Sequence, residues 1–132
     1  MKIVINKCFG GFGLSHKAVM QYAELKGFKL YPFVETGECH RFKPYGGGEV
    51  FLIHYSKAPL LDNGSYLEDS YFSDRDIERT DPILIKVVEE LKEKANGHSA
   101  KLSVIEIPDD IKWEIDEYDG IETVHEKHGS WG

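Results

Sequence analysis

The chain has 132 residues, of which 41% are hydrophobic and 30% charged, values typical of one globular domain and not of a disordered segment. All of the net charge of −7 lies in residues 106–132, which hold nine acidic and two basic side chains. This balance argues against generic nucleic-acid binding, and the lack of an apolar run of roughly 18 residues argues against a membrane helix.

The N-terminal residues 1–7 have the composition of a strand and lack the apolar segment and cleavage site of a signal peptide. Cys8 and Cys39 are therefore expected to be reduced thiols in the cytoplasm. A domain of this size needs neither a disulfide nor a metal to fold, and no cofactor-binding motif is complete. We therefore expect no cofactor and no metal, and the composition is compatible with a homo-oligomer.

The chain begins with a predicted strand over residues 2–8, in which apolar side chains alternate. A glycine-rich segment then interrupts regular structure. Ser15 is a favourable N-cap and Gly27 a favourable C-cap, so a first helix is expected over residues 16–26.

Two further strands are expected over residues 28–35 and 49–56. Pro32 donates no ladder hydrogen bond, which places the first of these strands at a sheet edge or at a bulge. Residues 57–80 then form a long polar connection, with a short helical turn near residues 74–78. A connection of this length is often functional or partly disordered.

The clearest predicted element is a second helix. Asp81 is a favourable N-cap, and Pro82 is a favourable first helical residue. One continuous apolar stripe follows, and Asn96-Gly97 ends the helix. The stripe consists of Leu84, Val87, Val88, Leu91 and Ala95.

Residues 101–107 and 111–118 alternate as strands do, and a tight hairpin between them is the simplest pairing. Residues 121–128 are compatible with a short helix or a strand, and Trp131 is expected to fold back onto the core. These elements predict a single α+β domain over residues 1–132, with a mainly antiparallel sheet of about five strands and two main helices on one face.

The glycine-rich turn before the first helix is a candidate ligand site. Close approach to the glycine backbone and the positive end of a Ser15-capped helix suit a phosphate or a carboxylate. The turn is neither a complete dinucleotide fingerprint nor a P-loop, and a structural turn with positive φ is the alternative. Arg79 could serve the same ligand or a structural ion pair. The candidate ligand-binding residues are Lys7, Gly10, Gly11, Gly13, Ser15 and Arg79.

Cys8 follows the first strand and is close in sequence to the start of the helix, where a lowered thiol pKa would make it a nucleophile. A buried inert thiol is the more common alternative. No catalytic residue is therefore assigned, and Cys8 is the one candidate. Cys39-His40 and His125-x-x-His128 lack a third spaced ligand, so they do not indicate a metal site.

The acidic C-terminal segment is a second candidate surface. Glu114, Asp116 and Tyr118 share one strand face by their period of two, and that face is expected to be solvated. It either promotes solubility or complements a basic partner protein, whose association such charge accelerates. The candidate partner-binding residues are Glu114, Asp116, Glu117 and Asp119.

Three segments carry a resemblance to small uncharacterised proteins of phages and prophages. They are Asn6-Lys7-Cys8-Phe9-Gly10-Gly11-Phe12-Gly13-Leu14-Ser15, Arg79-Thr80-Asp81-Pro82 and Glu117-Tyr118-Asp119-Gly120. The resemblance spans most of the chain and implies no particular activity, catalytic residue or substrate. It does imply an accessory protein of phage–host conflict, which either inhibits a host protein or captures a small signal molecule.

These observations favour three functions, in the following order. The first is non-enzymatic binding of a small anionic, nucleotide-like ligand at the glycine-rich turn. The second, nearly level with it, is a protein-interaction module or inhibitor of a host protein that acts through the acidic face. The third is a small hydrolase or transferase built on Cys8 and a histidine, for which the sequence shows no complete catalytic constellation.

Overall fold

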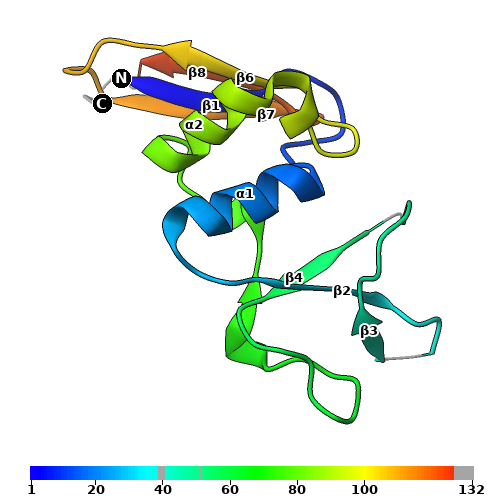
Figure 1. Cartoon of the computed structure of the whole chain (residues 1–132). Coiled ribbons are helices and arrows are strands. Elements are labelled where there is room, and N and C mark those ends of the chain that lie inside the picture. Colours follow the sequence, from blue (N-terminus) through cyan, green and yellow to red (C-terminus); the bar gives the residue numbers. More distant parts are fainter. Residues whose placement is uncertain (39–40, 51, 127–132) are drawn as a thin grey trace, which may run out of the picture.

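The computed structural model describes residues 1–38, 41–50 and 52–126. Within these ranges the chain forms a small α+β domain with two α-helices and eight strands in three antiparallel sheets (Figure 1). The predicted fold class and the antiparallel pairing are confirmed. The expectation of one sheet with about five strands was wrong, because the strands divide into a pair, a hairpin and a separate four-stranded sheet.

The first sheet joins the two ends of the described chain. Strand β1 (Lys2–Asn6) pairs with β6 (Leu102–Glu106), and β7 (Trp113–Tyr118) pairs with β8 (Ile121–Glu126) to form the hairpin. The predicted hairpin between residues 101–107 and 111–118 was therefore wrong. Asp119 and Gly120 both have positive φ, as a tight two-residue hairpin turn requires. The hairpin therefore forms between β7 and β8, and β6 pairs with the buried strand β1 instead.

Both helices begin at the predicted N-cap residues, and the first ends at the predicted Gly27, whereas the second ends at Leu91, before the predicted Asn96. In α1 (His16–Lys26) the Ser15 side chain accepts a hydrogen bond from the Ala18 N–H, and Gly27 closes the helix in the left-handed conformation. In α2 (Pro82–Leu91) the Asp81 carboxylate accepts from the N–H of Ile83 at 2.8 Å. A 3₁₀ turn, η3 (Lys92–Ala95), extends α2 to the predicted end at Asn96.

The third sheet lies in the middle of the chain, in the order β3-β2-β4-β5. Its strands are β2 (Tyr31–Glu35), β3 (Phe42–Pro44), β4 (His54–Ser56) and β5 (Tyr71–Phe72). The sequence allowed an edge strand or a bulge at Pro32, and of these the edge position was wrong, because β2 lies between β3 and β4. Pro32 is tolerated there because the β2–β3 register begins only at Phe33.

The predicted strand over residues 49–56 is shortened to β4, and the polar connection after it carries local structure. Two 3₁₀ turns, η1 (Glu68–Ser70) and η2 (Asp74–Asp76), flank β5. The helical turn expected near residues 74–78 is thus confirmed as η2. Residue Trp131, the pair Cys39-His40 and His128 lie outside the described residues.

The two helices form a stack and do not share one face of a single sheet. Helix α2 packs on β1 and β6, and α1 packs on α2 with the four-stranded sheet on its far side (Figure 1). Tyr22 of α1 reaches this sheet, since its ring lies 6.3 Å from that of Phe72. The buried residues at the centre include Val4, Val19, Leu84 and Val87. Among the described residues, none of the helices is both long and apolar enough to cross a membrane.

Candidate functional site

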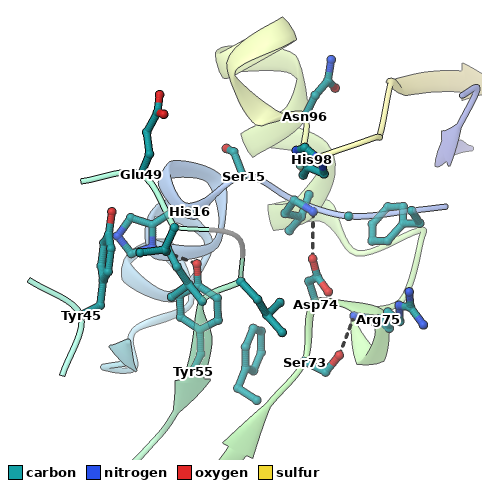
Figure 2. Close-up of a pocket in the computed structure, with 18 of the residues that line it drawn as sticks. Ser15, His16, Tyr45, Glu49, Tyr55, Ser73, Asp74, Arg75, Asn96 and His98 are labelled. Atoms are coloured by element: carbon teal, nitrogen blue, oxygen red, sulfur yellow. Dashed lines mark hydrogen bonds between the residues drawn. The ribbon is translucent and has the colours of Figure 1, made fainter. Parts of the chain in front are cut away.

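A cleft of about 1220 Å³ opens where the start of α1 faces the four-stranded sheet (Figure 2). Four parts of the chain line it, namely the end of the glycine-rich segment with the first turn of α1, the sheet with its loops, the η2 turn, and the segment after η3. Their polar side chains come from Ser15 and His16, from Tyr45, Glu49 and Tyr55, from Ser73, Asp74 and Arg75, and from Asn96 and His98. The volume exceeds the roughly 300–1,000 Å³ typical of small-molecule sites, so a small ligand would occupy only part of the cleft.

One end of the cleft is aromatic. The Nδ1 atom of His16 lies 2.9 Å from the Tyr55 hydroxyl, and the two rings are stacked at 5.7 Å between centroids. Tyr45 meets His16 edge to face at 5.1 Å. These rings come from α1, from β4 and from the loop after β3, so the fold assembles this end of the cleft from three separate segments.

Burial shifts the pKa values of two side chains at this end of the cleft, His16 and Tyr55. Desolvation lowers the pKa of His16 below its ordinary value, so the imidazole is neutral at pH 7. Burial also raises the pKa of Tyr55 well above the ordinary value, assisted by the negative charge of Asp74. A protonated Tyr55 hydroxyl can then donate to the Nδ1 atom of His16, which fixes the other ring nitrogen as N–H.

The other end of the cleft is polar and is tied to the glycine-rich segment. Asp74 accepts a hydrogen bond from the Leu14 N–H at 2.8 Å, which holds η2 against the start of α1. Arg75 is exposed, and among the described lining residues it is the only arginine or lysine and makes no ion pair. This end therefore includes one guanidinium, which comes from η2 and follows Asp74 in the chain.

Gly13 forms part of the wall of the cleft. Its carbonyl oxygen accepts a hydrogen bond from the Gly97 N–H at 2.9 Å. A Cβ atom on Gly97 would lie 2.7 Å from the Gly13 carbonyl carbon, whereas a Cβ atom on Gly13 would meet nothing within 4 Å. Gly97 is thus required for close packing, and Gly13 adjoins open space.

The structure separates the residues that the sequence grouped into one ligand site. Gly13 and Ser15 line the cleft. Gly10 and Gly11 lie instead against the β7–β8 turn, where the Gly10 N–H donates to the Asp119 carbonyl at 3.1 Å. Both have strongly positive φ, of 115° and 109°, a backbone conformation that favours glycine, so the turn itself accounts for these two residues.

Lys7 and Arg79 also lie away from the cleft lining. Lys7 is exposed after β1, and its N–H bonds the Lys101 carbonyl. The Arg79 guanidinium pairs with the Glu122 carboxylate, with Nη2 and Oε2 at 2.8 Å, and lies 3.7 Å from the centre of the Phe12 ring. Arg79 therefore occupies the structural ion pair that the sequence left as its alternative role.

Cys8 is half-buried just after β1 and is not part of the cleft lining. Its backbone is held by the Asn6 side chain, whose Nδ2 donates to the Cys8 carbonyl at 2.8 Å. The catalytic role considered for this thiol stays a prediction.

The acidic residues of the hairpin divide between two roles. Glu114 and Asp116 lie on either side of the His125 ring, with O–N distances of 2.7 and 3.2 Å. Glu117 accepts the Gly120 N–H at 3.0 Å, and Asp119 occupies the turn itself. These three exposed side chains bring metal-ligand atoms within 4.8 Å of one another, but exposed acidic groups of this kind are common without an ion, so they are not assigned as a metal site.

Sequence reasoning missed the residues that make the cleft from the four-stranded sheet and the η2 turn. His16, Tyr45 and Tyr55 are separated by long stretches of chain, and their spacing carries no motif. Asp74 and Arg75 could have been considered, because they lie in the polar connection over residues 57–80, and connections of this length are often functional.

Comparisons with protein-family models, with curated proteins and with solved structures found no match to this chain.

Proposed function

We propose that this protein is a non-enzymatic binder of a small anionic, nucleotide-like ligand, and that the ligand occupies the cleft beside the first turn of α1. The observation that carries the proposal is the cleft itself, of about 1220 Å³, with aromatic rings at one end and, at the other, a guanidinium that makes no ion pair with any other described residue. The lining combines apolar and aromatic side chains with the polar groups named above, and in small-molecule sites such polar groups fix the orientation of the ligand.

The aromatic end suits a flat heterocycle. Tyr45 and the neutral His16 offer ring surface and hydrogen-bonding atoms together, and Tyr71 is the third tyrosine of the lining after Tyr45 and Tyr55. Stacking on such side chains stabilises a bound base by about 1–3 kcal/mol and tolerates different bases. The ring of the ligand is accordingly assigned to this end.

The polar end suits the anionic group. Arg75 can contact phosphate or carboxylate oxygens with two N–H groups, and the N-terminus of α1 adds a partial positive charge. Asp74 keeps one carboxylate oxygen on the Leu14 N–H and so holds this end in shape. In this proposal Arg75 takes the role that the sequence assigned to Lys7 and Arg79, while Gly13 and Ser15 keep theirs.

Capture of a small molecule without turnover agrees with the resemblance to phage and prophage proteins, which implies an accessory role in phage–host conflict. We place this role in the cytoplasm, where nucleotide-like signals are found. The alternative of partner binding through the acidic hairpin concerns a different surface and is treated below.

The test is a calorimetric titration of adenosine, adenosine monophosphate and inorganic phosphate into the purified protein. We expect the monophosphate to bind more tightly than either fragment. Gly13→Leu should abolish binding, because a side chain at this position extends into open space beside the cleft. Gly46→Leu is the matched control, since a Cβ there also meets nothing within 4 Å and Gly46 does not line the cleft. Equal affinity in the two folded variants would contradict the proposal.

A further inference from the structure

The strongest feature outside the cleft is a pair of exposed aromatic residues, Phe9 and Tyr118. They are 62% and 75% exposed, the two highest values among the large hydrophobic residues described. Single exposed apolar side chains are common on soluble proteins. These two are not independent, because each adjoins one end of the hydrogen bond from the Gly10 N–H to the Asp119 carbonyl.

The backbone beneath this pair is held rigidly. A Cβ atom on Gly120 would lie 2.2 Å from the Gly11 nitrogen, so the glycine-rich turn and the hairpin turn are in direct backbone contact. The Asn6 Nδ2 atom donates to the Gly120 carbonyl at 2.7 Å, and this bond is buried. Aromatic side chains on a fixed backbone lose little conformational freedom on binding, which is the condition for an interaction hot spot.

The surroundings of the pair are acidic. Tyr118 follows Glu114 and Asp116 on the same face of β7, and all three side chains are exposed. Glu117 and Asp119 are its neighbours along the chain. Lys7 and Lys101 are exposed as well, and the Lys7 N–H donates to the Lys101 carbonyl at the end of the β1–β6 pair. We call the surface formed by Phe9, Tyr118 and the four acidic residues the hairpin corner.

We propose that the hairpin corner is a docking surface for a basic segment of a partner protein, whose apolar side chains cover Phe9 and Tyr118. The charge identifies the partner, because residues 113–121 hold four acidic side chains and no basic one, and all four acidic side chains are exposed. Complementary charge raises the association rate, and the two aromatic rings supply the buried contact. None of the residues of the hairpin corner lines the cleft, so this inference does not depend on the proposed ligand.

The test uses a labelled peptide of alternating arginine and leucine, ten residues long, with a glutamate–leucine peptide of equal length as the control. Fluorescence anisotropy measures the affinity, and amide chemical shifts of the ¹⁵N-labelled protein locate the contact. We expect only the basic peptide to bind, with shifts at residues 7–11 and 114–121. Its affinity should fall steeply with salt, and less steeply in Glu114→Gln plus Asp116→Gln.

The matched variants are Phe9→Ala and Tyr118→Ala, with Leu25→Ala on α1 as an exposed apolar control. Each aromatic variant should weaken binding by about tenfold or more, and the control should leave it unchanged. All three side chains are exposed, so the variants should keep the wild-type melting temperature. Unchanged affinity in Tyr118→Ala, shifts confined to cleft residues, or self-association of the protein that both aromatic variants remove would each overturn the proposal.

Discussion

The Glu122 carboxylate holds Arg79 and β1 at the same time. One oxygen of Glu122 lies 2.8 Å from Nη2 of Arg79, and the other accepts the backbone N–H of Asn6 at 2.8 Å. The side chains of Arg79 and Glu122 are only 18% and 8% exposed. This contact takes the place of a backbone ladder between β1 and β8, and so joins the hairpin to the core.

Removing one member of this pair should be strongly destabilising. Arg79→Ala or Glu122→Ala leaves a charge without its partner in a buried position, which costs about 3–5 kcal/mol of the free energy of unfolding. Urea unfolding followed by tryptophan fluorescence measures the change. Arg79→Met plus Glu122→Met, which removes both charges, should cost clearly less than the two single changes added together. Strict additivity would mean that the two side chains do not interact.

Asp81 should make the stability depend on pH. Burial alone would raise the pKa of its carboxyl, but hydrogen bonds from Lys26, Tyr22 and two backbone N–H groups outweigh it and lower the pKa. A carboxyl with a lowered pKa stabilises the fold fully above its unfolded pKa, and this contribution is lost as the pH falls through the folded pKa.

The free energy of unfolding should be measured from about pH 7 to about pH 3, a range that includes the pKa of a free carboxyl group. Over this range it should fall less for Asp81→Asn than for the wild type. The asparagine keeps a capping oxygen, whereas Asp81→Ala loses the cap as well, at a cost of about 0.5–2 kcal/mol. Identical pH profiles for wild type and Asp81→Asn would show that this carboxylate does not control the acid sensitivity.

The glycines should respond differently to the same substitution. Gly120→Ala places a Cβ 2.2 Å from the Gly11 nitrogen at a positive φ, so it should prevent or severely weaken folding. Gly11→Ala meets no atom but also needs a positive φ, at a cost of about 1–3 kcal/mol. Gly13→Ala should be nearly neutral. We expect the melting temperature to be highest for Gly13→Ala, lower for Gly11→Ala and lowest for Gly120→Ala. Any other order would contradict the packing of the two turns.

His16 should titrate below an ordinary histidine. Burial lowers its pKa, so the unfolded chain binds the proton more readily and stability falls as the pH drops from about 7 toward the folded pKa. Tyr45→Ala uncovers one edge of the ring and should move the pKa back toward its ordinary value. Proton–nitrogen spectra of the imidazole across this pH range give both values, and a wild-type pKa at or above the ordinary value would contradict the burial of the ring.

The residues near each helix end predicted the two helices, whereas the sequence did not predict which strands pair. Ser15, Gly27, Asp81 and Pro82 act within one turn of their own positions, and the structure has both helices where these residues place them. The partner of β6 could not be predicted in this way, because β1 and β6 lie almost a whole chain apart. The Asp119-Gly120 pair did carry the correct hairpin signal.

The cleft was also only partly predictable from the sequence. The glycine-rich turn was a visible feature, and its C-terminal end does reach the cleft through Gly13 and Ser15. The opposite wall could not be predicted, because Tyr45 and Tyr55 meet His16 of α1 only through the packing of the four-stranded sheet. Arg79 looked available in the sequence because its partner Glu122 is distant in the chain.

Native mass spectrometry of the protein purified from its natural host at low salt tests the central proposal most directly, with wild type and Gly13→Leu prepared side by side. A small anionic molecule should add its mass to the wild type and be absent from Gly13→Leu, while Gly46→Leu retains it. The same added mass on wild type and Gly13→Leu, or a bare wild type that also fails to bind any nucleotide in the titration, would contradict ligand capture in the cleft.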